Sequence, residues 1–170
     1  ELSKYPEMEK KERAFARRLA TGVIERQITL DFLIGHYSKT RVEKLKPMIR
    51  EILRMGLYQL YYMEVPPSAA CNEAVKLTKK RGLSGLSGYV NGVLRAAARD
   101  GLCLEKEFSS CGEEELLSLR YSIPRWLVEK FLSWYGREES ERIFSAFFAP
   151  PTFTVRVNVS KGEVSSCREH

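Results

Sequence analysis

The sequence lacks the short motifs on which several common classes of enzyme depend. It contains no G-x-G-x-x-G, no G-x-x-x-x-G-K-[ST], no H-E-x-x-H and no G-x-S-x-G. These motifs are the signatures of dinucleotide binding, nucleotide binding, zinc proteolysis and serine hydrolysis. Their absence, with acidic runs such as "EEE" and "REESER" that are typical of solvated helix faces, leaves no candidate catalytic residue.

Histidine and paired cysteine are also scarce. The histidines are His36 and His170, and no two of the four cysteines are spaced as C-x-x-C. A structural zinc site needs four clustered ligands at short spacings, so we expect no metal site. Reduced thiols in a cytoplasmic protein are the simplest interpretation of the four cysteines Cys71, Cys103, Cys111 and Cys167.

Long apolar runs are missing as well. No stretch of about 18 apolar residues could span a membrane, and the polar start "ELSKYPEMEKKERAF" has neither a signal-peptide core nor an initiating Met. We therefore expect a chain that begins inside a longer protein or has been trimmed. Its 170 residues are 44% hydrophobic, enough for a folded core in one domain, or in one domain and part of another.

Positive charge is concentrated in the first part of the chain. Residues 1–100 hold 19 Lys and Arg against 11 Asp and Glu, whereas residues 101–170 hold 9 against 11. Between Ala74 and Arg99 there are six basic residues and no acid. Unopposed cations of this kind suit a polyanion such as nucleic acid, and an ordinary lysine-rich surface is the alternative.

Hydrophobic periodicity predicts helices through the basic part. A helix over 9–26 places Phe15, Leu19 and Val23 on one apolar face, and Thr29 is a candidate cap for the next helix. The most apolar helix follows Pro47 and is expected to be central, with a glycine that allows close helix packing. The next two helices have predicted caps at Ser68 or Asn72, a stop at Gly82, and a cap at Ser87.

The second part begins with two more predicted helices. "YSIPRWLVEKFLSWYG" has Ser122 as its candidate cap and Gly136 as its stop, and "REESERIFSAFFAPP" follows. We expect the two tryptophans of the first segment, Trp126 and Trp134, to pack on the preceding bundle. "TFTVRVNV" then alternates in the manner of a strand. Because a lone strand is unstable, it needs partners in a following domain or in a neighbouring molecule.

The basic segments give a set of candidate nucleic-acid contacts. Tyr89 is a possible stacking surface for an unpaired base. Gly82, Gly85 and Gly88 either let backbone N–H groups approach a phosphate or simply allow a tight turn between helices. The predicted RNA-binding residues are Arg13, Arg17, Arg18, Lys79, Lys80, Arg81, Tyr89, Arg95 and Arg99.

Two parts of the sequence carry a resemblance to known proteins. "LRMGLYQLYYMEVPPSAACNEAVKLTKKRG" followed by "YVNGVLRAAAR" resembles the NusB-like helical RNA-binding fold, and "ERAFARRLATGVIERQITLDFLI" fits the preceding part of that family. "YSIPRWLVEKFLSWYG" and "FTVRVN" are similar to the bridge into the catalytic part of Sun/Fmu (RsmB-type) ribosomal RNA cytosine-5 methyltransferases. The family's usual first helix is missing or cut down, and none of the four cysteines matches a catalytic one.

The resemblance implies an all-α fold. It consists of a NusB-like helical bundle, a helical linker and the first strand of a truncated α/β domain. The predicted domains are residues 1–104 for the RNA-binding bundle, 105–151 for a linker that packs on it, and 152–170 for the start of a methyltransferase N-terminal subdomain. In this arrangement the "VNGVL" helix is a core element, and Arg95 and Arg99 lie on its solvent-exposed side.

The resemblance also implies a function. The chain would hold RNA, in particular small-subunit ribosomal RNA, for a catalytic domain that is missing here. In that domain a cysteine thiolate would attack cytosine and S-adenosylmethionine would supply the methyl group, so no cofactor is expected in this chain. Two alternatives are a stand-alone antitermination factor and a protein-docking module whose basic face binds an acidic partner.

Overall fold

The computed structural model describes residues 8–108, 111–149, 156, 158 and 160, and all regular structure within them is helical. The predicted strand over 152–159 falls almost wholly outside the described residues and stays a prediction. The helices are α1 (Lys10–Glu25), α2 (Gln27–Tyr37), η2 (Val42–Lys44), α3 (Pro47–Tyr62), α4 (Pro67–Lys80), η3 (Ser84–Leu86), α5 (Ser87–Arg99), α6 (Leu104–Glu107), α7 (Glu113–Tyr121) and α8 (Arg125–Ala146).

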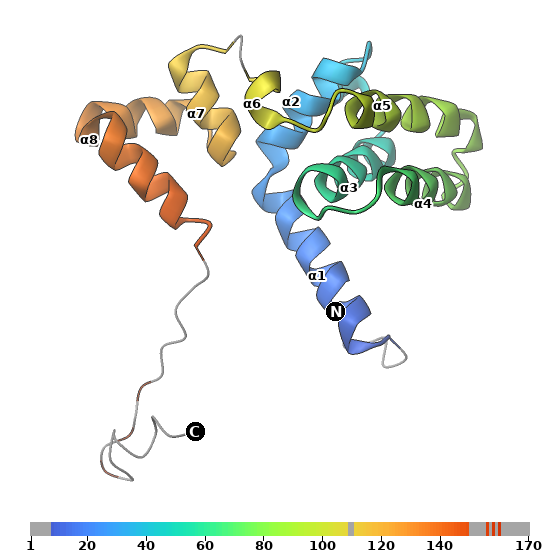
Figure 1. Ribbon diagram of the computed structural model, residues 1–170, viewed down its shortest axis with the longest axis horizontal. Coiled ribbons are helices and arrows are strands. Elements are labelled where there is room, and N and C mark those ends of the chain that lie inside the picture. The colour runs from blue at the N-terminus through green and yellow to red at the C-terminus, as the bar shows by residue number, and fades with distance from the viewer. Residues whose placement is uncertain (1–7, 109–110, 150–155, 157, 159, 161–170) are drawn as a thin grey trace.

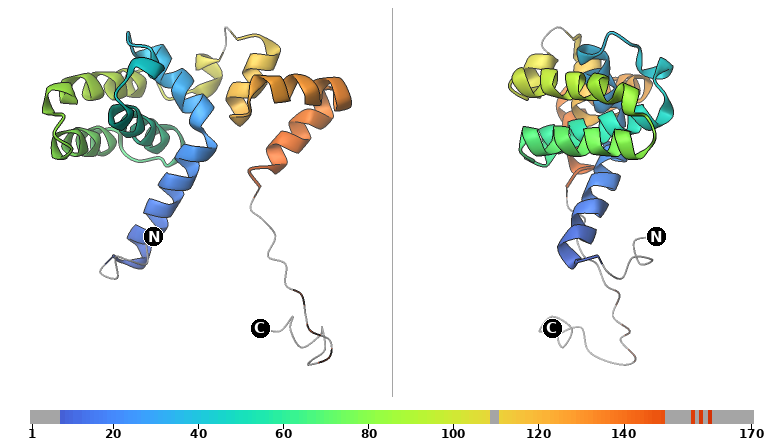
Figure 2. Two further views of the ribbon diagram at one scale, coloured as in Figure 1. Left: turned by 180° about the vertical axis from the view of Figure 1, so that it is seen from behind. Right: turned by 90° about the vertical axis from the view of Figure 1, so that its right-hand side faces the viewer.

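The helices form two groups (Figures 1 and 2). The larger lobe contains α1 to α6, and the smaller lobe contains α7 and α8. Helix α2 contacts α3 and α5 in the larger lobe and α7 in the smaller one, so it joins the two. The first half of α1 extends away from the bundle (Figure 1). The NusB-like segments and "YSIPRWLVEKFLSWYG" are therefore helical for most of their length, as the sequence predicted.

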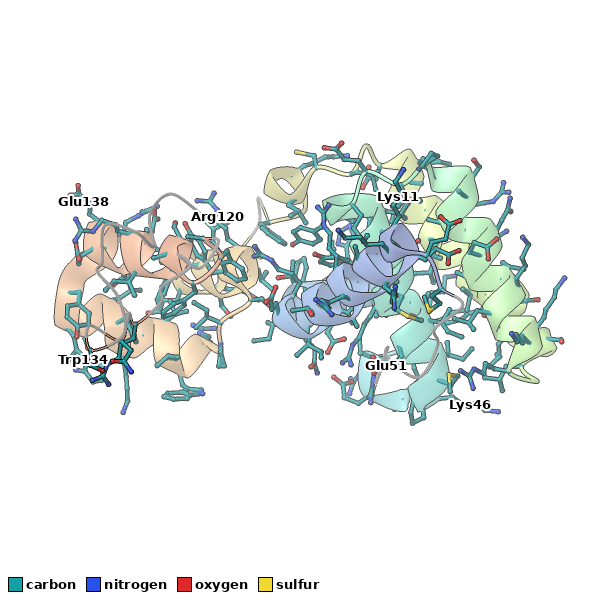
Figure 3. The ribbon with its side chains drawn as sticks, turned by 90° about the horizontal axis from the view of Figure 1, so that it is seen from below. Lys11, Lys46, Glu51, Arg120, Trp134 and Glu138 are labelled. Atoms are coloured by element: carbon teal, nitrogen blue, oxygen red, sulfur yellow. The ribbon has the colours of Figure 1, made fainter. Side chains whose placement is uncertain are left out.

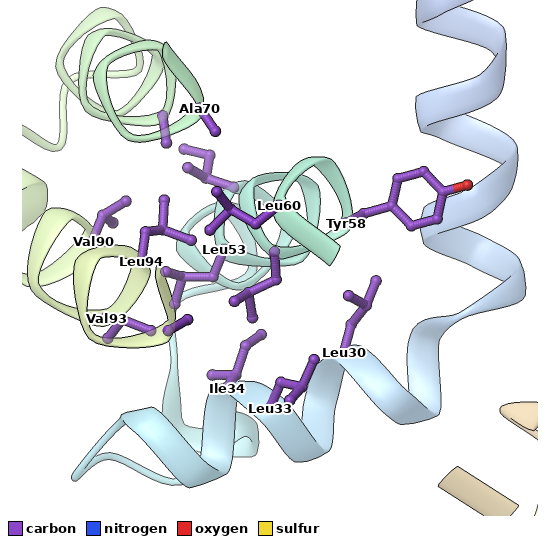
Figure 4. Close-up of a cluster of buried hydrophobic side chains, with 14 of the residues drawn as sticks. Leu30, Leu33, Ile34, Leu53, Tyr58, Leu60, Ala70, Val90, Val93 and Leu94 are labelled. Atoms are coloured by element: carbon purple, nitrogen blue, oxygen red, sulfur yellow. The ribbon is translucent and has the colours of Figure 1, made fainter. Parts of the chain in front are cut away.

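Helix α3 is the centre of the larger lobe, as predicted. It contacts α1, α2, α4 and α5, and its leucine and isoleucine side chains meet Leu30 and Ile34 of α2 and Val90 of α5 in one core (Figure 4). Gly56 of α3 allows the close approach of α5, because a Cβ at this position would lie 2.7 Å from a methyl carbon of Leu94. Burial of these apolar side chains is the main source of stability.

The predicted apolar face of α1 is only partly buried. Val23 is buried, but Phe15 is 43% exposed, because the first half of α1 extends beyond its neighbours (Figure 1). Gly22 brings the second half close to α3, where Tyr58 points directly toward α1 (Figure 4). Phe15 and Leu19 therefore share one face of α1, as predicted, but that face is buried only toward the end of the helix.

Helices α4 and α5 form an antiparallel hairpin closed by the glycine-rich turn. Gly82 has a left-handed backbone with φ of 73°, and it ends α4 as predicted. The N–H groups of Gly82 and Leu83 donate to the carbonyl oxygens of Lys79 and Thr78, at 3.0 and 3.1 Å. This is a Schellman motif. It shows that Gly82 serves the tight interhelical turn.

The smaller lobe is an α7–α8 hairpin with its own small core of Leu117, Ile123, Val128 and Phe144. Helix α8 is broken at Gly136, whose φ of 73° and ψ of 179° are not helical, so the predicted stop there is confirmed. The lobe packs on α2 through buried polar contacts. The Thr29 hydroxyl donates to the carbonyl oxygen of Leu119 at 2.6 Å, and the guanidinium of Arg26 lies 3.6 Å from the ring centre of Phe148.

Four predicted caps were wrong. Helix α2 begins before Thr29, and α4 begins at Pro67, ahead of both Ser68 and Asn72. Proline suits the first position of a helix because it has no N–H to leave unpaired. Ser87 is the first residue of α5, and its hydroxyl donates to the carbonyl oxygen of Ser84. The fourth, Ser122, ends α7 in a left-handed conformation.

The tryptophans do not pack on the bundle. Trp126 and Trp134 are 60% and 62% exposed, and the ring centre of Trp134 lies 6.0 Å from that of Phe131 on the same helix. Lys130 lies between them, with its ammonium 5.9 and 5.8 Å from the two ring centres. The expectation that these rings cover the larger lobe was therefore wrong. In the part of the chain that the structure describes, no helix is both long enough and apolar enough to cross a membrane.

Candidate nucleic-acid interface

Within the described part of the chain, the predicted RNA-binding cations are not neutralised by carboxylates. Among the described residues, no ion pair involves any of the eight, which are Arg13, Arg17, Arg18, Lys79, Lys80, Arg81, Arg95 and Arg99. In the smaller lobe, by contrast, Arg125, Arg137 and Arg142 each pair with one or two glutamates at 2.8–3.3 Å. Among the described residues, the larger lobe therefore presents basic side chains without carboxylate partners. In the smaller lobe, glutamates neutralise three of the arginines.

The eight cations fall into three groups on different helices. The first group lies on α1, which is seen in front of the larger lobe with Lys11 near its start (Figure 3). The second lies at the C-terminal end of α4, and the third is the pair Arg95 and Arg99 on α5. Arg18 is partly restrained, because it donates to the carbonyl oxygen of Tyr62 at 3.0 Å. The structure thus distributes the cations over the lobe and does not gather them into one patch.

Lys80 of the second group borders an apolar groove of about 640 Å³ between α1, α3 and α4. Phe15 and Leu19 line it from α1, and Lys76 and Lys80 line it from α4. Lys76 is paired with Glu73 at 2.7 Å, whereas Lys80 has no such partner among the described residues. Arg17 and Arg18 face a separate hollow beside Tyr58, so α1 presents its apolar and basic sides in different directions.

The third group lies in a pocket of about 410 Å³ between the start of α4 and the second half of α5. We call it the α4–α5 pocket. Both of its arginines are exposed. Arg95 is held in place by Asn91, whose side-chain oxygen accepts from its Nε at 3.1 Å. The residues that line this pocket are Pro67, Ser68, Cys71, Gly92, Arg95, Ala98 and Arg99.

The remaining predicted contact, Tyr89, has a structural role. It is half-buried against the larger core, and its hydroxyl lies 2.6 Å from the Ser38 hydroxyl. Because the Ser38 hydroxyl donates to the carbonyl oxygen of Thr40, Tyr89 is the donor to Ser38. The bond ties α5 to the segment after α2. Base stacking on Tyr89 stays a prediction.

Arg54, a cation outside the predicted RNA-binding set, belongs to the core rather than to the surface. Arg54 is buried and donates to both carboxylate oxygens of Asp31, at 2.7 and 2.6 Å, and to Glu51 at 2.7 Å. Burial lowers the pKa of Arg54, but the hydrogen bonds and charges of Asp31 and Glu51 outweigh it and raise the pKa overall. Arg54 is therefore permanently charged and joins α3 to α2.

Two members of the α4–α5 pocket carried no signal in the sequence. Ser68 was considered as a helix cap and Gly92 as part of a core helix, yet both line the pocket with Arg95. Only the antiparallel packing of α4 on α5 brings positions 68 and 92 together. Across the described residues, no cluster of three histidine, cysteine or carboxylate side chains could hold a metal ion.

Comparison with known proteins gives two matches along the chain. The model of the NusB family matches residues 1–99. The model of the ferredoxin-like domain of RsmF/B-like methyltransferases matches residues 123–170. Together they account for most of the larger lobe, for α8 and for the segment after it.

Individual relatives show the same division. The chain is 39% identical over 163 residues to a probable ribosomal RNA small subunit methyltransferase B of Synechocystis, covering 94% of this chain and 35% of that protein. It is 34% identical over 159 residues to the probable Bacillus subtilis protein of the same name, covering 92% and 35%. It is also 38% identical to the transcription antitermination protein NusB of Nitratiruptor, over 53% of this chain and 66% of that protein. The chain thus spans about a third of the length of these two methyltransferases.

Proposed function

The chain belongs to the NusB family, and from this premise we propose that it binds RNA as the non-catalytic part of a ribosomal RNA methyltransferase. Its task is to hold small-subunit ribosomal RNA for a cytosine-5 methylation carried out elsewhere in the whole protein. S-adenosylmethionine would be bound by the catalytic domain of that protein, which is the second proposed partner of this chain. The proposed location is the cytoplasm, where ribosomal RNA is modified.

The observation that carries RNA binding is the contrast in charge pairing between the two lobes. Cations already paired with carboxylates must lose those partners before they can bind phosphate. The predicted RNA-binding cations of α1, α4 and α5 have no such partner among the described residues. Each phosphate that they neutralise releases condensed counterions, which supplies the free energy of binding. The larger lobe is therefore the proposed RNA-binding surface.

The lengths of the matches favour a methyltransferase over a stand-alone antitermination factor. The Nitratiruptor NusB protein matches 53% of the chain, and the NusB family model ends at residue 99, before α7. The Synechocystis and Bacillus methyltransferases match 94% and 92%, so they include α7 and α8. A factor that needs only the NusB fold gives no reason for this second lobe.

RNA binding is tested by fluorescence anisotropy with a labelled small-subunit ribosomal RNA fragment at several salt concentrations. We expect log K to fall linearly with log salt concentration, with a slope of about −0.7 for each contacted phosphate of single-stranded RNA. The change Lys79→Glu with Lys80→Glu should weaken binding strongly. The matched control, Lys130→Glu with Arg142→Glu on α8, changes the net charge by the same amount and should have a much smaller effect.

Two outcomes would overturn the proposal. The first is the absence of RNA binding at about 50 mM salt, where electrostatic binding is strong; this result would favour the protein-docking alternative. The second is equal weakening by the two double changes, because net charge rather than the larger lobe would then determine affinity. Circular dichroism of each variant checks that helix content is unchanged.

A further inference from the structure

We propose that the α4–α5 pocket is a binding site for one phosphate group of the RNA backbone, held between Arg95 and Arg99. The inference rests on the proposed function, because RNA is the source of the phosphate. It assigns to two arginines a single shared ligand rather than two separate contacts. It also adds Ser68 and Asn91 to the residues that take part.

The spacing of the two arginines favours a shared ligand. Arg95 and Arg99 are four residues apart on α5, so their side chains leave the same face of the helix one turn apart. Both line the same pocket, and neither has a carboxylate partner among the described residues. A guanidinium presents a planar fork of donors that matches two phosphate oxygens. Two such forks facing one hollow can bind one phosphate from two sides.

Asn91 prepares Arg95 for this role. It accepts a hydrogen bond from Nε of Arg95 at 3.1 Å, which occupies the inner edge of the guanidinium. The two Nη groups have no hydrogen-bond partner among the described residues, so they remain available as donors. A side chain that is already oriented loses less conformational entropy when it binds. Asn91 is thus a positioning residue for Arg95.

The opposite wall of the pocket is the start of α4. The N–H groups of Ala69 and Ala70 already donate to the carbonyl oxygen of Pro66, at 2.9 and 3.1 Å, and Pro67 has no N–H. The Ser68 N–H has no partner among the described residues, and its side chain is exposed beside it. Both are donors that a phosphate can use, and the positive end of the 14-residue helix adds to the attraction.

No acidic residue is among the described residues that line the pocket. The acid nearest in sequence on α4, Glu73, is paired with Lys76, and Asp100 at the end of α5 is paired with Lys106. The floor of the pocket is the Cys71 side chain, which is 2% exposed. Burial raises the pKa of its thiol despite the nearby charge of Arg95, so the floor is neutral at pH 7. The pocket therefore combines two positively charged side chains with an uncharged floor.

The size of the pocket fits a nucleotide unit. Its volume of about 410 Å³ lies toward the lower end of the range for small-molecule sites, about 300–1,000 Å³. This space accepts a phosphate together with its attached ribose. Gly92 borders open space, because a Cβ there would meet no atom within 4 Å. A larger side chain at this position would therefore occupy part of the pocket between Ser68 and Arg95.

The test compares Arg95→Gln, Arg99→Gln and the double variant by RNA binding at several salt concentrations, using the whole 170-residue chain. Each single change should weaken binding on the order of tenfold, since charge-assisted hydrogen bonds are lost. If both arginines hold one phosphate, the double variant should bind only slightly more weakly than either single variant, with a salt slope lowered by about 0.7. Independent contacts would instead multiply the two losses and lower the slope by about 1.4.

A second measurement locates the ligand. The backbone amide signals of Ser68 and Gly92 in ¹⁵N NMR spectra should shift on addition of RNA, and should not shift in the double variant. Arg95→Lys should also weaken binding, since it keeps the charge but loses the planar fork. Addition of inorganic phosphate alone should shift the same signals at millimolar concentration.

The outcomes separate this site from the proposed function. If the wild-type chain binds RNA while the double variant binds equally well and the Ser68 signal is unmoved, the site is wrong and the function stands. If inorganic phosphate shifts the signals and RNA does not, the pocket is an anion site unconnected with RNA, and the proposal is overturned. If no RNA is bound at all, both the site and the function fall.

Discussion

The hydroxyl of Ser122 caps a helix that lies 94 residues earlier in the chain. Its Oγ accepts a hydrogen bond from the backbone N–H of Ile28 at 3.0 Å, in the first turn of α2. Helix α2 begins after Arg26, which makes no side-chain cap of its own. The smaller lobe thus supplies a group that the larger lobe lacks. Because first-turn N–H groups have no intrahelical partner, the contact links the stability of α2 to the docking of α7.

Replacement of Ser122 by Ala should therefore lower the free energy of unfolding by about 1 kcal/mol, the usual effect of losing a helix cap. Urea unfolding followed by circular dichroism measures the change. Ser122→Gly should be less harmful, since glycine relieves the left-handed backbone, with φ of 52°, while losing the same cap. The control is Ser133→Ala, whose exposed hydroxyl bonds only within α8. Equal losses at Ser122 and Ser133 would show that the long-range cap contributes nothing.

A second prediction concerns the contact between α3 and α5. Gly56→Ala should destabilise the protein by about 1–3 kcal/mol, as overpacking of a filled core does, because the fully buried Leu94 cannot move aside. Gly35→Ala is the matched control, since a Cβ on this exposed residue of α2 meets no atom within 4 Å. It should stabilise by about 0.5–1 kcal/mol. In thermal unfolding, Gly56→Ala should lower the midpoint temperature and Gly35→Ala should raise it. Shifts of both midpoints in the same direction would contradict the packing argument.

A third prediction concerns Arg54. Arg54→Met should destabilise the fold by about 2–3 kcal/mol, below the usual loss for a broken buried pair because Asp31 and Glu51 are partly exposed. Adding Asp31→Leu should recover part of the loss, since the unpaired carboxylate is then removed. Arg41→Met, at an exposed position without an ion pair among the described residues, should change stability by less than about 0.5 kcal/mol. Denaturant titration of all three variants measures these losses of unfolding free energy and tests whether they fall in this order.

The fourth prediction is a dependence of stability on pH through Cys71. Burial raises the pKa of this thiol in the folded state, so the unfolded chain loses the proton at lower pH than the folded one. The contribution of Cys71 is complete below the unfolded pKa and is lost as pH rises through the folded pKa. The difference in unfolding free energy between wild type and Cys71→Ala should shrink as pH rises from neutral into the alkaline range above about 8.5, the usual pKa of an unperturbed thiol. A constant difference over this range would refute the assignment.

The sequence by itself determined most of the local structure. Several local features depend on only a few neighbouring residues. They are the regular spacing of apolar residues in α3, the prolines that begin α3 and α4, and the glycines that end α4 and interrupt α8. Their effects on the backbone are local: proline fixes φ and has no N–H, and glycine adopts positive φ without strain. The uneven distribution of charge was equally visible, because it is a property of composition. The NusB-like segments were identified from motifs of the same local kind.

The tertiary structure decided which side chains face one another. Only the fold places Arg54 against Asp31. Ser122 was predicted to cap its own helix, whereas its hydroxyl accepts from the first turn of α2 because α7 packs on α2. The α4–α5 pocket likewise exists only because two helices pack side by side and bring Ser68 to Arg95. Hydrogen bonds and ion pairs act over a few ångströms in space, whereas residues 23 to 94 positions apart have no fixed distance until the core has formed. For this reason the charge of the candidate interface could be predicted from sequence, but its geometry could not.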